Sequence, residues 1–408
     1  MKNGWQTKKL GELAEIELGK TPARANSALW DEKRETGNVW LSIADLLNAK
    51  NNIVVDSKEY VSDKGAAMCK LVPNGTLLVS FKLTLGRLAF AGHDLYTNEA
   101  IAALTLFSER ELSKEFLFWF LQFFDWVKAA ENDVKLKGMT LNKAKLKELV
   151  VHFPKSLSEQ KRIVGILDET FDGVATAKAN AEKNLQNARA LFESHLQSVF
   201  TQRGEGWVEK PLAELCDIKH GFAFKSEFFT DSGDYVLLTP GNFYESGGYR
   251  DRGEKQKYYS GEIPDGFVLS EGDLLVAMTE QAAGLLGSPI LIPESGKFLH
   301  NQRLGLVTKK PGASWTNEFF FHVFNTQPVR KAIHDSASGV KVRHTSPTKI
   351  GEVVVSFPIS ISEQRAIVSK LNNLDEETQR LESVYQQKLA ALGELKKSLL
   401  HEAFSGKL

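Results

Sequence analysis

Lysines and arginines gather in two stretches of the chain, each directly after an aromatic segment, and such side chains bind phosphate groups. The stretch 128–149 carries Lys128, Lys135, Lys137, Lys143, Lys145 and Lys147, and the stretch 330–349 carries Arg330, Lys331, Lys341, Arg343 and Lys349. A charge run is often only a solvated face, and either stretch alone would fit that interpretation. Because the pattern recurs at equivalent places, we favour phosphate contact for both.

Two further loops each follow an apolar run that is typical of a β-strand. One is Lys82-Leu-Thr-Leu-Gly-Arg87, and the other is Thr279-Glu-Gln-Ala-Ala-Gly284. Lysine, arginine, threonine and glutamine are the side chains that read base edges in a DNA major groove. Each loop taken singly is a weak indication.

The sequence has near matches to motifs for catalysis, but none is complete. Gly19-Lys20-Thr21 resembles the end of a phosphate-binding loop, but position 14 is alanine and no glycine opens the loop. Pro264-Asp265 could begin a nuclease motif, yet no Glu-x-Lys follows at a suitable distance, and a turn is the better interpretation. The nine histidines form no HxxxH or HExxH pattern, and there is no Pro-Pro pair or Gly-x-Gly-x-x-Gly loop.

The segments 113–130 and 316–332 are each predicted to form one aromatic helix. The first contains Phe116, Phe118, Trp119, Phe120, Phe123, Phe124 and Trp126. Such a cluster could be a platform for stacking bases. A helix that is aromatic on most of its faces is better explained as core.

These elements belong to a unit that occurs twice. Glu148-Leu-Val-Val-His-Phe-Pro returns as Glu352-Val-Val-Val-Ser-Phe-Pro, and twelve of the twenty positions from 148 to 167 match those 204 positions later. The segment from Trp5 returns from Trp207 with seven of fifteen positions identical. The interiors diverge, as expected for two copies of one domain that read two different things.

Each repeat ends in a long helical pattern. Ser156 with Glu159, and Ser360 with Glu363, predict capping boxes after Phe-Pro pairs that end a strand. Apolar residues then recur with the spacing of a coiled-coil seam. Since only 201–206 separates the first helix from the next compact segment, we expect the two helices to be antiparallel. The predicted seam consists of Leu167, Phe171, Val174, Leu185, Phe192, Val199, Leu371, Leu374, Leu381, Tyr385, Leu392, Leu395 and Leu399.

Composition limits the class of protein. The 408 residues, 42% of them hydrophobic and 25% charged, suffice for two domains with cores. There is neither a run of eighteen apolar residues nor an N-terminal signal region, so no membrane partner is expected. Cys69 and Cys216 do not correspond between the repeats, which disfavours a disulfide or metal knot and fits a cytoplasmic location. The net charge of zero argues against indiscriminate coating of nucleic acid, but not against local basic patches.

Three features together resemble a known family. They are the two Trp starts that run to Leu-x-Glu-Leu, the two Phe-Pro-x-Ser-[Leu/Ile]-Ser-Glu-Gln helix openings, and Asn301-Gln302 after a strand. This combination is similar to the specificity subunit of type I restriction-modification systems, over essentially the whole chain. The first repeat departs from it with Asn98-Glu99, so the resemblance does not imply a shared DNA role at this position.

The resemblance implies that each globular segment is a target recognition domain, similar to that of an adenine methyltransferase. It implies that the helices space these domains and bind two modification subunits, which a restriction (translocase-nuclease) subunit would join. S-adenosylmethionine, ATP and magnesium would then belong to the partners, and this chain would hold no cofactor of its own.

We therefore predict an α+β fold class, with two pseudo-twofold-related target recognition domains separated by two long antiparallel coiled-coil helices. The predicted divisions are a first recognition domain at 1–155, a central helix at 156–203, a second recognition domain at 204–358 and a C-terminal helix at 359–408. The predicted function is non-catalytic recognition of a bipartite, asymmetric sequence in double-stranded DNA. The alternatives are a coiled-coil scaffold without DNA specificity and a stand-alone DNA enzyme with an unrecognised motif.

The candidate DNA-binding residues lie in the loops of both predicted domains. Those of the first are Lys20, Trp40, Lys82, Thr84, Arg87, Lys135 and Lys137, and those of the second are Phe224, Lys225, Asn242, Thr279, Gln281, Arg303, Lys341 and Arg343. For Trp40 and Phe224 a structural role is the better interpretation. The sequence predicts neither the DNA target nor the length of its spacer.

Overall fold

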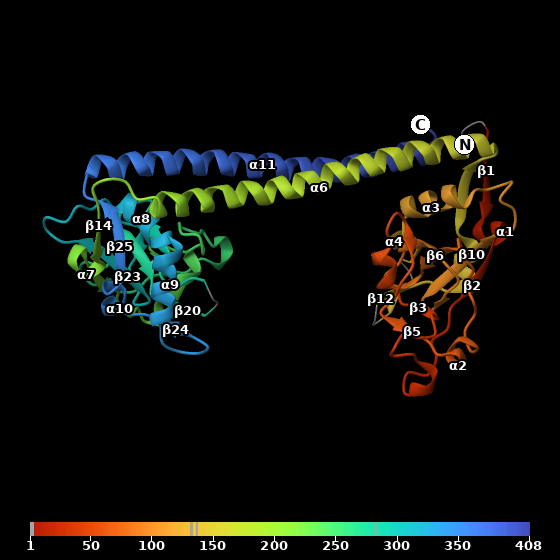
Figure 1. Ribbon diagram of the computed structural model, residues 1–408, viewed down its shortest axis with the longest axis horizontal. Coiled ribbons are helices and arrows are strands. Elements are labelled where there is room, and N and C mark those ends of the chain that lie inside the picture. The colour runs from red at the N-terminus through yellow and green to blue at the C-terminus, as the bar shows by residue number, and fades with distance from the viewer. Residues whose placement is uncertain (1–3, 131–133, 136–137, 282–283) are drawn as a thin grey trace. The chain divides into compact units, whose positions relative to one another are not determined.

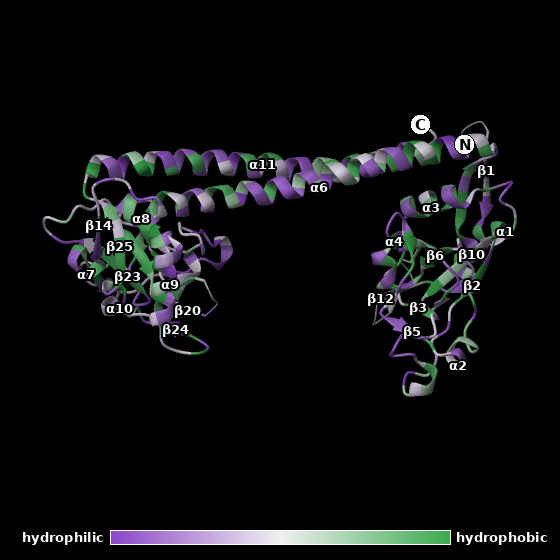
Figure 2. Ribbon diagram, in the orientation of Figure 1, coloured by the Kyte–Doolittle hydropathy of each residue, from purple (hydrophilic) through white to green (hydrophobic). Residues whose placement is uncertain are grey.

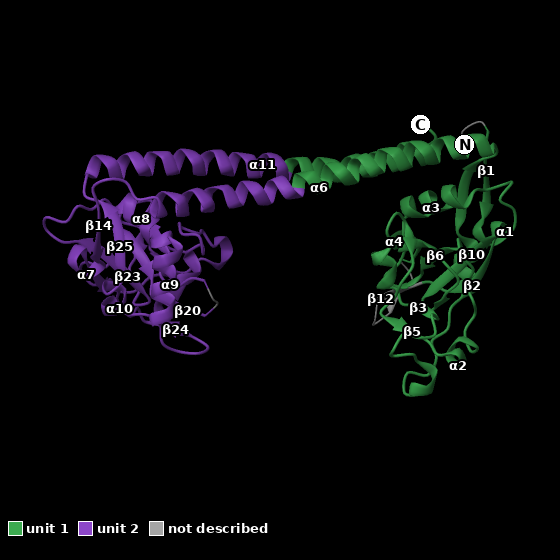
Figure 3. Ribbon diagram, in the orientation of Figure 1, with its two compact units in different colours: residues 1–181, 387–408 green, residues 182–386 purple. Residues whose placement is uncertain are grey.

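The computed structural model describes residues 4–130, 134–135, 138–281 and 284–408. The chain divides into two compact units, shown in Figure 1 and coloured separately in Figure 3. Unit 1 comprises residues 1–181 and 387–408, and unit 2 comprises residues 182–386. Each unit contains one head and a part of both long helices, α6 (Leu157–Thr201) and α11 (Ile361–Ser405). The sequence divides the chain instead where heads meet helices, and that division stays a prediction.

The head of unit 1 is built on a five-stranded sheet, whose central strand β6 is buried along its whole length because all four of its side chains are apolar or small. In order across the sheet the strands are β2 (Ala14–Leu18), β10 (Ile101–Leu106), β6 (Leu77–Ser80), β8 (Leu88–Ala91) and β4 (Ile53–Val54). One smaller sheet has β5 (Glu59–Tyr60), β3 (Val39–Leu41) and β9 (Tyr96–Thr97), and another has β11 (Val134–Lys135), β12 (Gly138–Thr140) and β7 (Lys82–Leu83). The helices are α1 (Leu10–Leu13), α2 (Asp63–Ala66), α3 (Lys114–Phe123), α4 (Trp126–Ala129) and α5 (Lys143–Glu148).

The head of unit 2 repeats this plan. Its main sheet has, in order, β15 (Cys216–His220), β23 (Leu304–Lys309), β19 (Leu274–Ala277) and β21 (Pro289–Leu291). The smaller sheets are β16 (Phe229–Thr230), β18 (Tyr258–Tyr259), β17 (Val236–Leu237) and β22 (Phe298–Leu299), and the pair β20 (Thr279–Glu280) and β24 (Arg343–His344). The helices are α7 (Leu212–Leu215), α8 (Asn317–Asn325), α9 (Gln327–Ser336) and α10 (Pro347–Gly351). The predicted α+β class is confirmed for both heads.

The two ends of each repeat pair with each other in the same register. β1 (Trp5–Lys9) is antiparallel to β13 (Val150–Pro154) with Trp5 opposite Pro154, and β14 (Trp207–Pro211) is antiparallel to β25 (Val354–Pro358) with Trp207 opposite Pro358. Proline lacks a backbone donor and therefore suits the last position of a strand. The matching ends of the repeats are thus the strand pair from which each long helix departs.

A buried glutamine fastens the head of unit 1 to α6. Oε1 of Gln160 accepts a hydrogen bond from the backbone N–H of Ser113 at 2.9 Å. Nε2 donates to the carbonyls of Glu111 at 2.9 Å and Pro154 at 2.8 Å. The side chain is 0% exposed. It joins the end of β13, the start of α3 and the first turn of α6.

Gln364 makes the same connection in unit 2. Its Oε1 accepts from the backbone N–H of Thr316, and its Nε2 donates to the carbonyls of Ser314 and Pro358, all at 3.0 Å. It is also 0% exposed. The glutamine of the repeated Ser-Glu-Gln motif is therefore an internal connector.

The serine of each predicted capping box caps its helix. The backbone N–H of Glu159 donates to Oγ of Ser156 at 3.4 Å, and that of Glu363 to Oγ of Ser360 at 3.3 Å. These bonds satisfy amides that the first helical turn leaves without a partner. In unit 2 the glutamate also accepts from Nε1 of Trp207 at 3.0 Å, which ties β14 to α11.

Each aromatic segment forms two helices, and the prediction of one helix was wrong. In unit 1, α3 ends at Phe123, and Asp125 caps α4 by accepting from the N–H of Lys128 at 3.0 Å. In unit 2, Pro328 stands in the first turn of α9, where proline is tolerated although it cannot continue a helix. The core interpretation of the aromatic cluster is confirmed for Phe116, Phe118, Trp119, Phe120 and Trp126, all of which are buried.

The two long helices contact each other within each unit. In unit 1, Nη2 of Arg162 donates to the carbonyl of Leu408, three residues after the end of α11, at 3.0 Å. Further along α6, the ammonium of Lys396 on α11 lies 5.0 Å from the ring of Phe171. Residues further along α6 contact residues earlier in the C-terminal segment, so the two helices run antiparallel within unit 1. In unit 2, Arg189 of α6 pairs with Glu382 of α11 at 2.9 Å.

Most residues of the predicted seam are shielded from solvent, and the seam itself stays a prediction. Leu167 and Leu371 are fully buried, and Phe171, Val174, Leu185, Phe192, Val199, Leu374, Tyr385, Leu392 and Leu399 are half-buried. Leu381 and Leu395 are more open to solvent, at 38% and 44% exposed. They lie three residues beyond the line Leu371, Thr378, Tyr385, Leu392 and Leu399, which repeats every seven residues.

The strands of the heads and the two long helices also differ in hydropathy. Figure 2 shows mostly hydrophobic residues on strands such as β23 and β25, whereas α6 and α11 mix both kinds from turn to turn. In the part of the chain that the structure describes, no helix combines the length and apolar character needed to cross a membrane.

Candidate nucleic-acid interface

In unit 1 the fold places both predicted basic segments in one small sheet. β7 pairs with β12, with Lys82 opposite Thr140, and β12 pairs with β11, which contains Lys135. The loop 82–87 and the stretch 128–149 are therefore adjacent although about fifty residues apart in sequence. Lys137, which was also predicted to bind DNA, lies outside the described residues.

The corresponding segments of unit 2 are also paired. β20 and β24 are antiparallel, with Glu280 opposite Arg343. Beyond the pair, the N–H of Thr345 donates to the carbonyl of Met278 at 3.0 Å. In both units, the strand that continues from the core of the sheet thus meets the basic stretch that follows the aromatic helices. The sequence predicted these segments separately and could not show that they meet.

A β-turn lies in the same place in each head, after the strand β9 or β22. The N–H of Ile101 donates to the carbonyl of Asn98 at 3.2 Å, and the N–H of Leu304 donates to that of Asn301 at 3.0 Å. In both turns the asparagine Oδ1 also accepts from a backbone N–H two residues on, at 3.0 Å in unit 1 and 3.1 Å in unit 2. Two turns of unlike sequence are thus held in the same conformation.

The segment after the first strand of each main sheet runs beside this turn. A Cβ added to Gly19 or to Gly221 would lie 2.2 Å from the backbone oxygen of Asn98 or Asn301, so only glycine fits there. The next residues, Lys20 and Phe222, are exposed. Each candidate surface is therefore made of three segments: the one after this glycine, the turn, and the paired basic segments.

A buried carboxylate organises the loop of unit 2 that follows β20. Glu280 is 2% exposed, and its Oε2 accepts from the backbone N–H groups of Gly284 at 3.0 Å, Leu285 at 3.0 Å and Leu286 at 3.1 Å. Arg330 also donates to the carbonyl of Gly284. Burial lowers the pKa of Arg330 to about 10, although Glu280 acts to raise it, so the guanidinium is charged at neutral pH.

Arg343 and His334 continue this network toward the surface. Nη2 of Arg343 donates to the carbonyl of His334 at 2.6 Å, and Nε2 of His334 lies 3.7 Å from Oε1 of Glu280. The guanidinium of Arg343 is therefore engaged inside unit 2, and its role in holding the loop competes with DNA contact.

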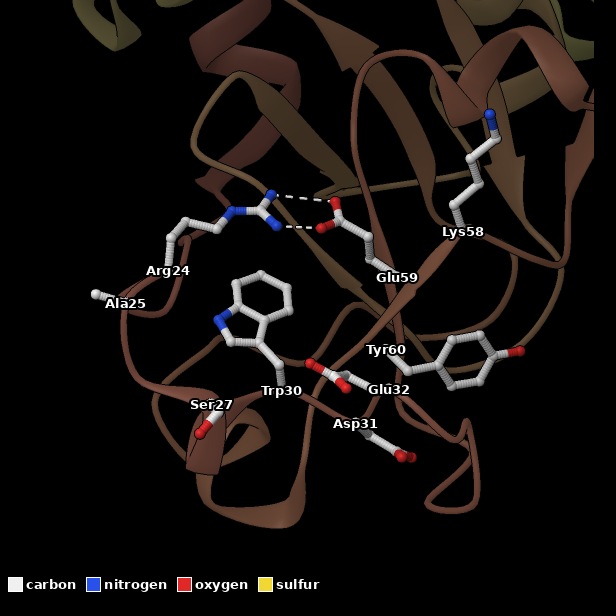
Figure 4. A pocket seen from close by; sticks show the side chains of 9 residues that line it. All are labelled: Arg24, Ala25, Ser27, Trp30, Asp31, Glu32, Lys58, Glu59 and Tyr60. Atoms are coloured by element: carbon white, nitrogen blue, oxygen red, sulfur yellow. Dashed lines mark hydrogen bonds and ion pairs between the residues drawn. The ribbon is translucent and has the colours of Figure 1, made fainter.

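In unit 1 a surface hollow of about 290 Å³ lies beside the segment after Gly19. Figure 4 shows the guanidinium of Arg24 directed at the carboxylate of Glu59 across the ring of Trp30. The guanidinium carbon lies 4.2 Å from the centre of the Trp30 ring and 4.8 Å from that of Trp40. Ring stacking and the paired hydrogen bonds together hold this arginine in one orientation.

The predicted DNA-binding side chains differ in how the fold presents them. Those that are exposed are Lys20, Thr84, Lys225, Gln281, Arg303 and Lys341, and those that are half-buried are Lys82, Arg87 and Arg343. Nη1 of Arg87 donates a hydrogen bond to the carbonyl of Ile43 at 3.1 Å. DNA contact by these residues stays a prediction, and the side chain of Lys135 is not described.

Four candidate side chains lie inside the fold; this agrees with the structural role favoured for Trp40 and Phe224 and corrects the proposed presentation of Asn242 and Thr279 to DNA. Trp40 is 1% exposed and donates to the carbonyl of Lys20 at 3.0 Å, and Phe224 is 6% exposed in a small core. Asn242 is 1% exposed and donates to Gln256 at 2.8 Å. Thr279 is 9% exposed, with its hydroxyl 3.2 Å from Nδ1 of His344.

Three residues of these surfaces were missed by sequence reasoning: Arg24, Glu99 and Glu280. The partners of Arg24 and Glu99 lie 35 and 78 positions away in the sequence. Nothing near either residue in the sequence indicates these pairs. Among the described residues, no three His, Cys, Asp or Glu side chains gather in a way that could hold a metal ion.

Both repeats match one family model, described as "Type I restriction modification DNA specificity domain", over residues 2–186 and again over residues 204–390. The chain belongs to this family. The resemblance seen in the sequence is thereby confirmed. In this type I specificity-domain protein, each copy of the family's domain covers one head together with a large part of the helix that follows it.

Two curated relatives of this type I specificity-domain protein align over about half of their own length. The chain is 27% identical over 240 residues to the Type I restriction enzyme EcoBI specificity subunit of Escherichia coli, covering 57% of this chain and 44% of that protein. It is 23% identical over 240 residues to the Type I restriction enzyme MjaIX specificity subunit of Methanocaldococcus jannaschii, covering 53% of this chain and 52% of that protein.

Solved structures share the fold. One, from work on complex assembly and conformational transition of the type I R-M system, has a TM-score of 0.73 and 16% identity, covering 100% of this chain and 99% of that one. The HsdS subunit from Thermoanaerobacter tengcongensis has a TM-score of 0.61 and 16% identity, covering 100% and 98%. At this identity the likeness concerns the fold alone.

Proposed function

We propose that this chain is the DNA sequence-specificity subunit of a type I restriction-modification complex. Each head reads one half of a bipartite, asymmetric site in double-stranded DNA. The helix pair sets the unread spacer and binds two methyltransferase (modification) subunits. The observation that carries the proposal is the family match to both repeats, combined with two surfaces of the same construction and unlike side chains.

The chemistry of the two surfaces suits this division of labour. Lysines and arginines such as Lys20, Lys82 and Lys341 neutralise phosphates, which supplies affinity and register but carries no sequence information. Base readout then falls to side chains on turns and loops held rigidly by the fold. Because the two heads share their frame and differ in these side chains, they read different half-sites.

We assign no catalysis to this chain. Methylation and cleavage belong to partner subunits, which bring S-adenosylmethionine, ATP and magnesium, and restriction subunits join the modification core. The cytoplasm, where chromosomal DNA lies, is the compartment we propose. A stand-alone DNA enzyme is the competing proposal, and it requires turnover of DNA by the pure chain with cofactors and without partners.

A binding-site selection tests the proposal. The full-length chain, co-expressed with its methyltransferase subunit, is used to select from a library of random double-stranded DNA. We expect two short conserved half-sites separated by a spacer of fixed length and free sequence. Binding without sequence preference would instead make the chain a scaffold, and a single uninterrupted site would contradict reading by two heads.

The spacer itself gives a second readout. One heptad inserted into each long helix, at the boundaries 181/182 and 386/387, adds about 10 Å of helix, because each residue adds about 1.5 Å. At about 3.4 Å per base pair, the preferred spacer should grow by about three base pairs. An unchanged spacer would show that the helices do not determine the separation of the half-sites.

A further inference from the structure

A strained turn lies in the candidate surface of unit 1. Leu83, the last residue of β7, has a φ of 64°, in the left-handed region that leucine rarely adopts. The N–H of Thr84 donates to the carbonyl of Lys82 at 2.8 Å, so the backbone closes a γ-turn about Leu83. A γ-turn whose central residue has a positive φ is the rare and strained form. A glycine would adopt this conformation without strain.

The surrounding structure holds this γ-turn in place. Ser80, the last residue of β6, is fully buried, and its Oγ donates to the carbonyl of Thr84 and accepts from the N–H of Arg87 at 2.9 Å. The backbone carbonyl of Ser80 accepts from the N–H of Gly86 at 2.9 Å. A strained residue persists only where its neighbours fix it, and such residues are concentrated at functional sites.

Folding does not account for a leucine at this position. The side chain of Leu83 is 53% exposed, so it buries little apolar surface to offset the strained backbone. In unit 2, Glu280 stands third after the end of β19, as Leu83 stands third after the end of β6. Glu280 is 2% exposed and holds its own loop, whereas unit 1 holds its loop through Ser80. The leucine side chain is therefore left to reach solvent.

The exposed leucine stands among polar and basic residues. Lys82 precedes it and Thr84 follows it, and β7 is paired with β12, which is paired in turn with β11. A two-stranded ribbon such as β7 with β12 fits into the major groove of DNA. Phosphates bind the lysines of such a surface but offer an apolar side chain no contact. The apolar group on a base edge in the major groove is the C5-methyl of thymine.

We propose that Leu83 is a specificity-determining residue that contacts the C5-methyl group of a thymine in the half-site read by unit 1. The ribbon of β7 and β12 enters the major groove, with its lysines at the phosphates and the γ-turn at the base pairs. The fixed turn holds the leucine side chain in one direction, as recognition of a single methyl group requires. This inference rests on the proposed function and assigns it one base contact.

Deoxyuridine tests the proposal, because it differs from thymidine only by the missing C5-methyl group. The full-length chain with its methyltransferase subunit is first used to select the bipartite motif, and each thymine of the motif is then replaced in turn. At one thymine of one half-site, wild-type affinity should fall about fourfold, the effect of one buried methyl group. In Leu83→Ala and Leu83→Gly the same replacement should change affinity less than about 1.5-fold. Leu83→Met keeps an apolar side chain and should keep the wild-type response.

Stability separates base reading from a structural role. Leu83→Gly relieves the left-handed strain, so its midpoint of urea unfolding should be no lower than that of the wild type. Loss of a packing residue would lower the midpoint instead. The control is Leu71→Ala, which removes a leucine of similar exposure, 49%, from outside the candidate surface and should keep the fourfold response to deoxyuridine.

If no thymine of the motif shows a response to deoxyuridine that depends on Leu83, the residue belongs to the framework of the loop and the proposal fails. A leucine that intercalates between base pairs would also overturn it, because the Leu83 variants would then bind DNA with thymine and DNA with deoxyuridine more weakly by the same factor. Both results are distinct from failure of the proposed function, in which the wild-type complex selects no bipartite motif at all.

Discussion

In unit 1 the indole of Trp119 donates to the carboxylate of Asp168 on α6 at 2.8 Å, whereas in unit 2 the imidazole of His322 interacts with the side chain of Asn372 on α11. The two pairs occupy equivalent positions of the repeat, 203 and 204 residues apart. Their chemistry differs, but a ring meets a polar side chain on the long helix in both units. The repeated fold therefore fixes the position of this contact, but not the residue types that make it.

The two glutamine connectors differ from these pairs because their residue type and their hydrogen bonds are the same in both units. Gln160 and Gln364 bond to the same three kinds of backbone group, at positions where a side chain has to accept on one side and donate on the other. Further from the helices the heads diverge most. The segment of unit 1 that contains Arg24 corresponds in sequence to the segment of unit 2 that contains Phe222 and Phe224.

Of the substitutions predicted here, removal of a glutamine connector should cause the largest loss of unfolding free energy. Gln160→Ala and Gln364→Ala each leave buried backbone groups without partners, at about 1–3 kcal/mol for each such group. We expect each variant to lose about 3 kcal/mol of unfolding free energy, measured by urea denaturation of the full-length chain. Because the two connectors have the same geometry, the two losses should agree within about 1 kcal/mol.

The control for this prediction is Gln186→Ala, at an exposed position of α6, which should change the unfolding free energy by less than about 0.5 kcal/mol. A large loss in one connector variant and none in the other would show that the heads are attached differently, despite their matching hydrogen bonds.

The strand ends, helix starts and helix spacing could be predicted from the sequence because each depends on residues within a few positions. The Phe-Pro ends, the serine caps and the seven-residue spacing of Leu371 and Leu392 follow from strand, cap and helix geometry within a few residues. The exposure of Leu381 was missed since spacing alone does not say which positions face the partner helix. Glu99 and Glu280 were missed for a different reason, because their roles depend on groups brought together only by folding.

Acidification should weaken unit 2 through His322. Burial lowers the pKa of this histidine to about 4, against an ordinary 6.5 and only partly offset by Asn372, so the unfolded chain binds the proton first as the pH falls. The stabilisation is fully present above pH 6.5 and is lost as the pH falls toward 4. Between pH 7 and pH 5 this amounts to about 2 kcal/mol, measurable by urea denaturation at both pH values.

His322→Gln keeps a polar partner for Asn372 but cannot titrate, and about 2 kcal/mol of the pH dependence should disappear with it. His195→Gln replaces an exposed histidine of α6 and should retain the full dependence. If His322→Gln behaves like wild type at both pH values, the protonation of this docking contact does not govern the stability of unit 2. The indole of Trp119 has no such titration, so the comparison predicts an acid sensitivity that originates in one head.

The smallest expected effect concerns the phosphates, where the two heads should behave alike. Lys20→Ala in unit 1 and Lys341→Ala in unit 2 each remove one exposed cation from a candidate surface. Each should weaken DNA binding by the assembled complex by a similar factor for every sequence and reduce the slope of log affinity against log salt by about 1. Titrations from 50 to 200 mM salt measure both quantities.

Lys309 supplies the matched control for these two lysines. It is exposed at the end of β23 away from Arg303, which separates it from the candidate surface by the length of a six-residue strand, about 20 Å. Lys309→Ala should therefore leave the salt slope unchanged. A change of motif on removing Lys20 or Lys341 would mean that these cations read bases, and the division between phosphate contacts and turn residues such as Leu83 would then have to be redrawn. Equal slopes in all three variants would instead move the DNA-binding surface to another face of the heads.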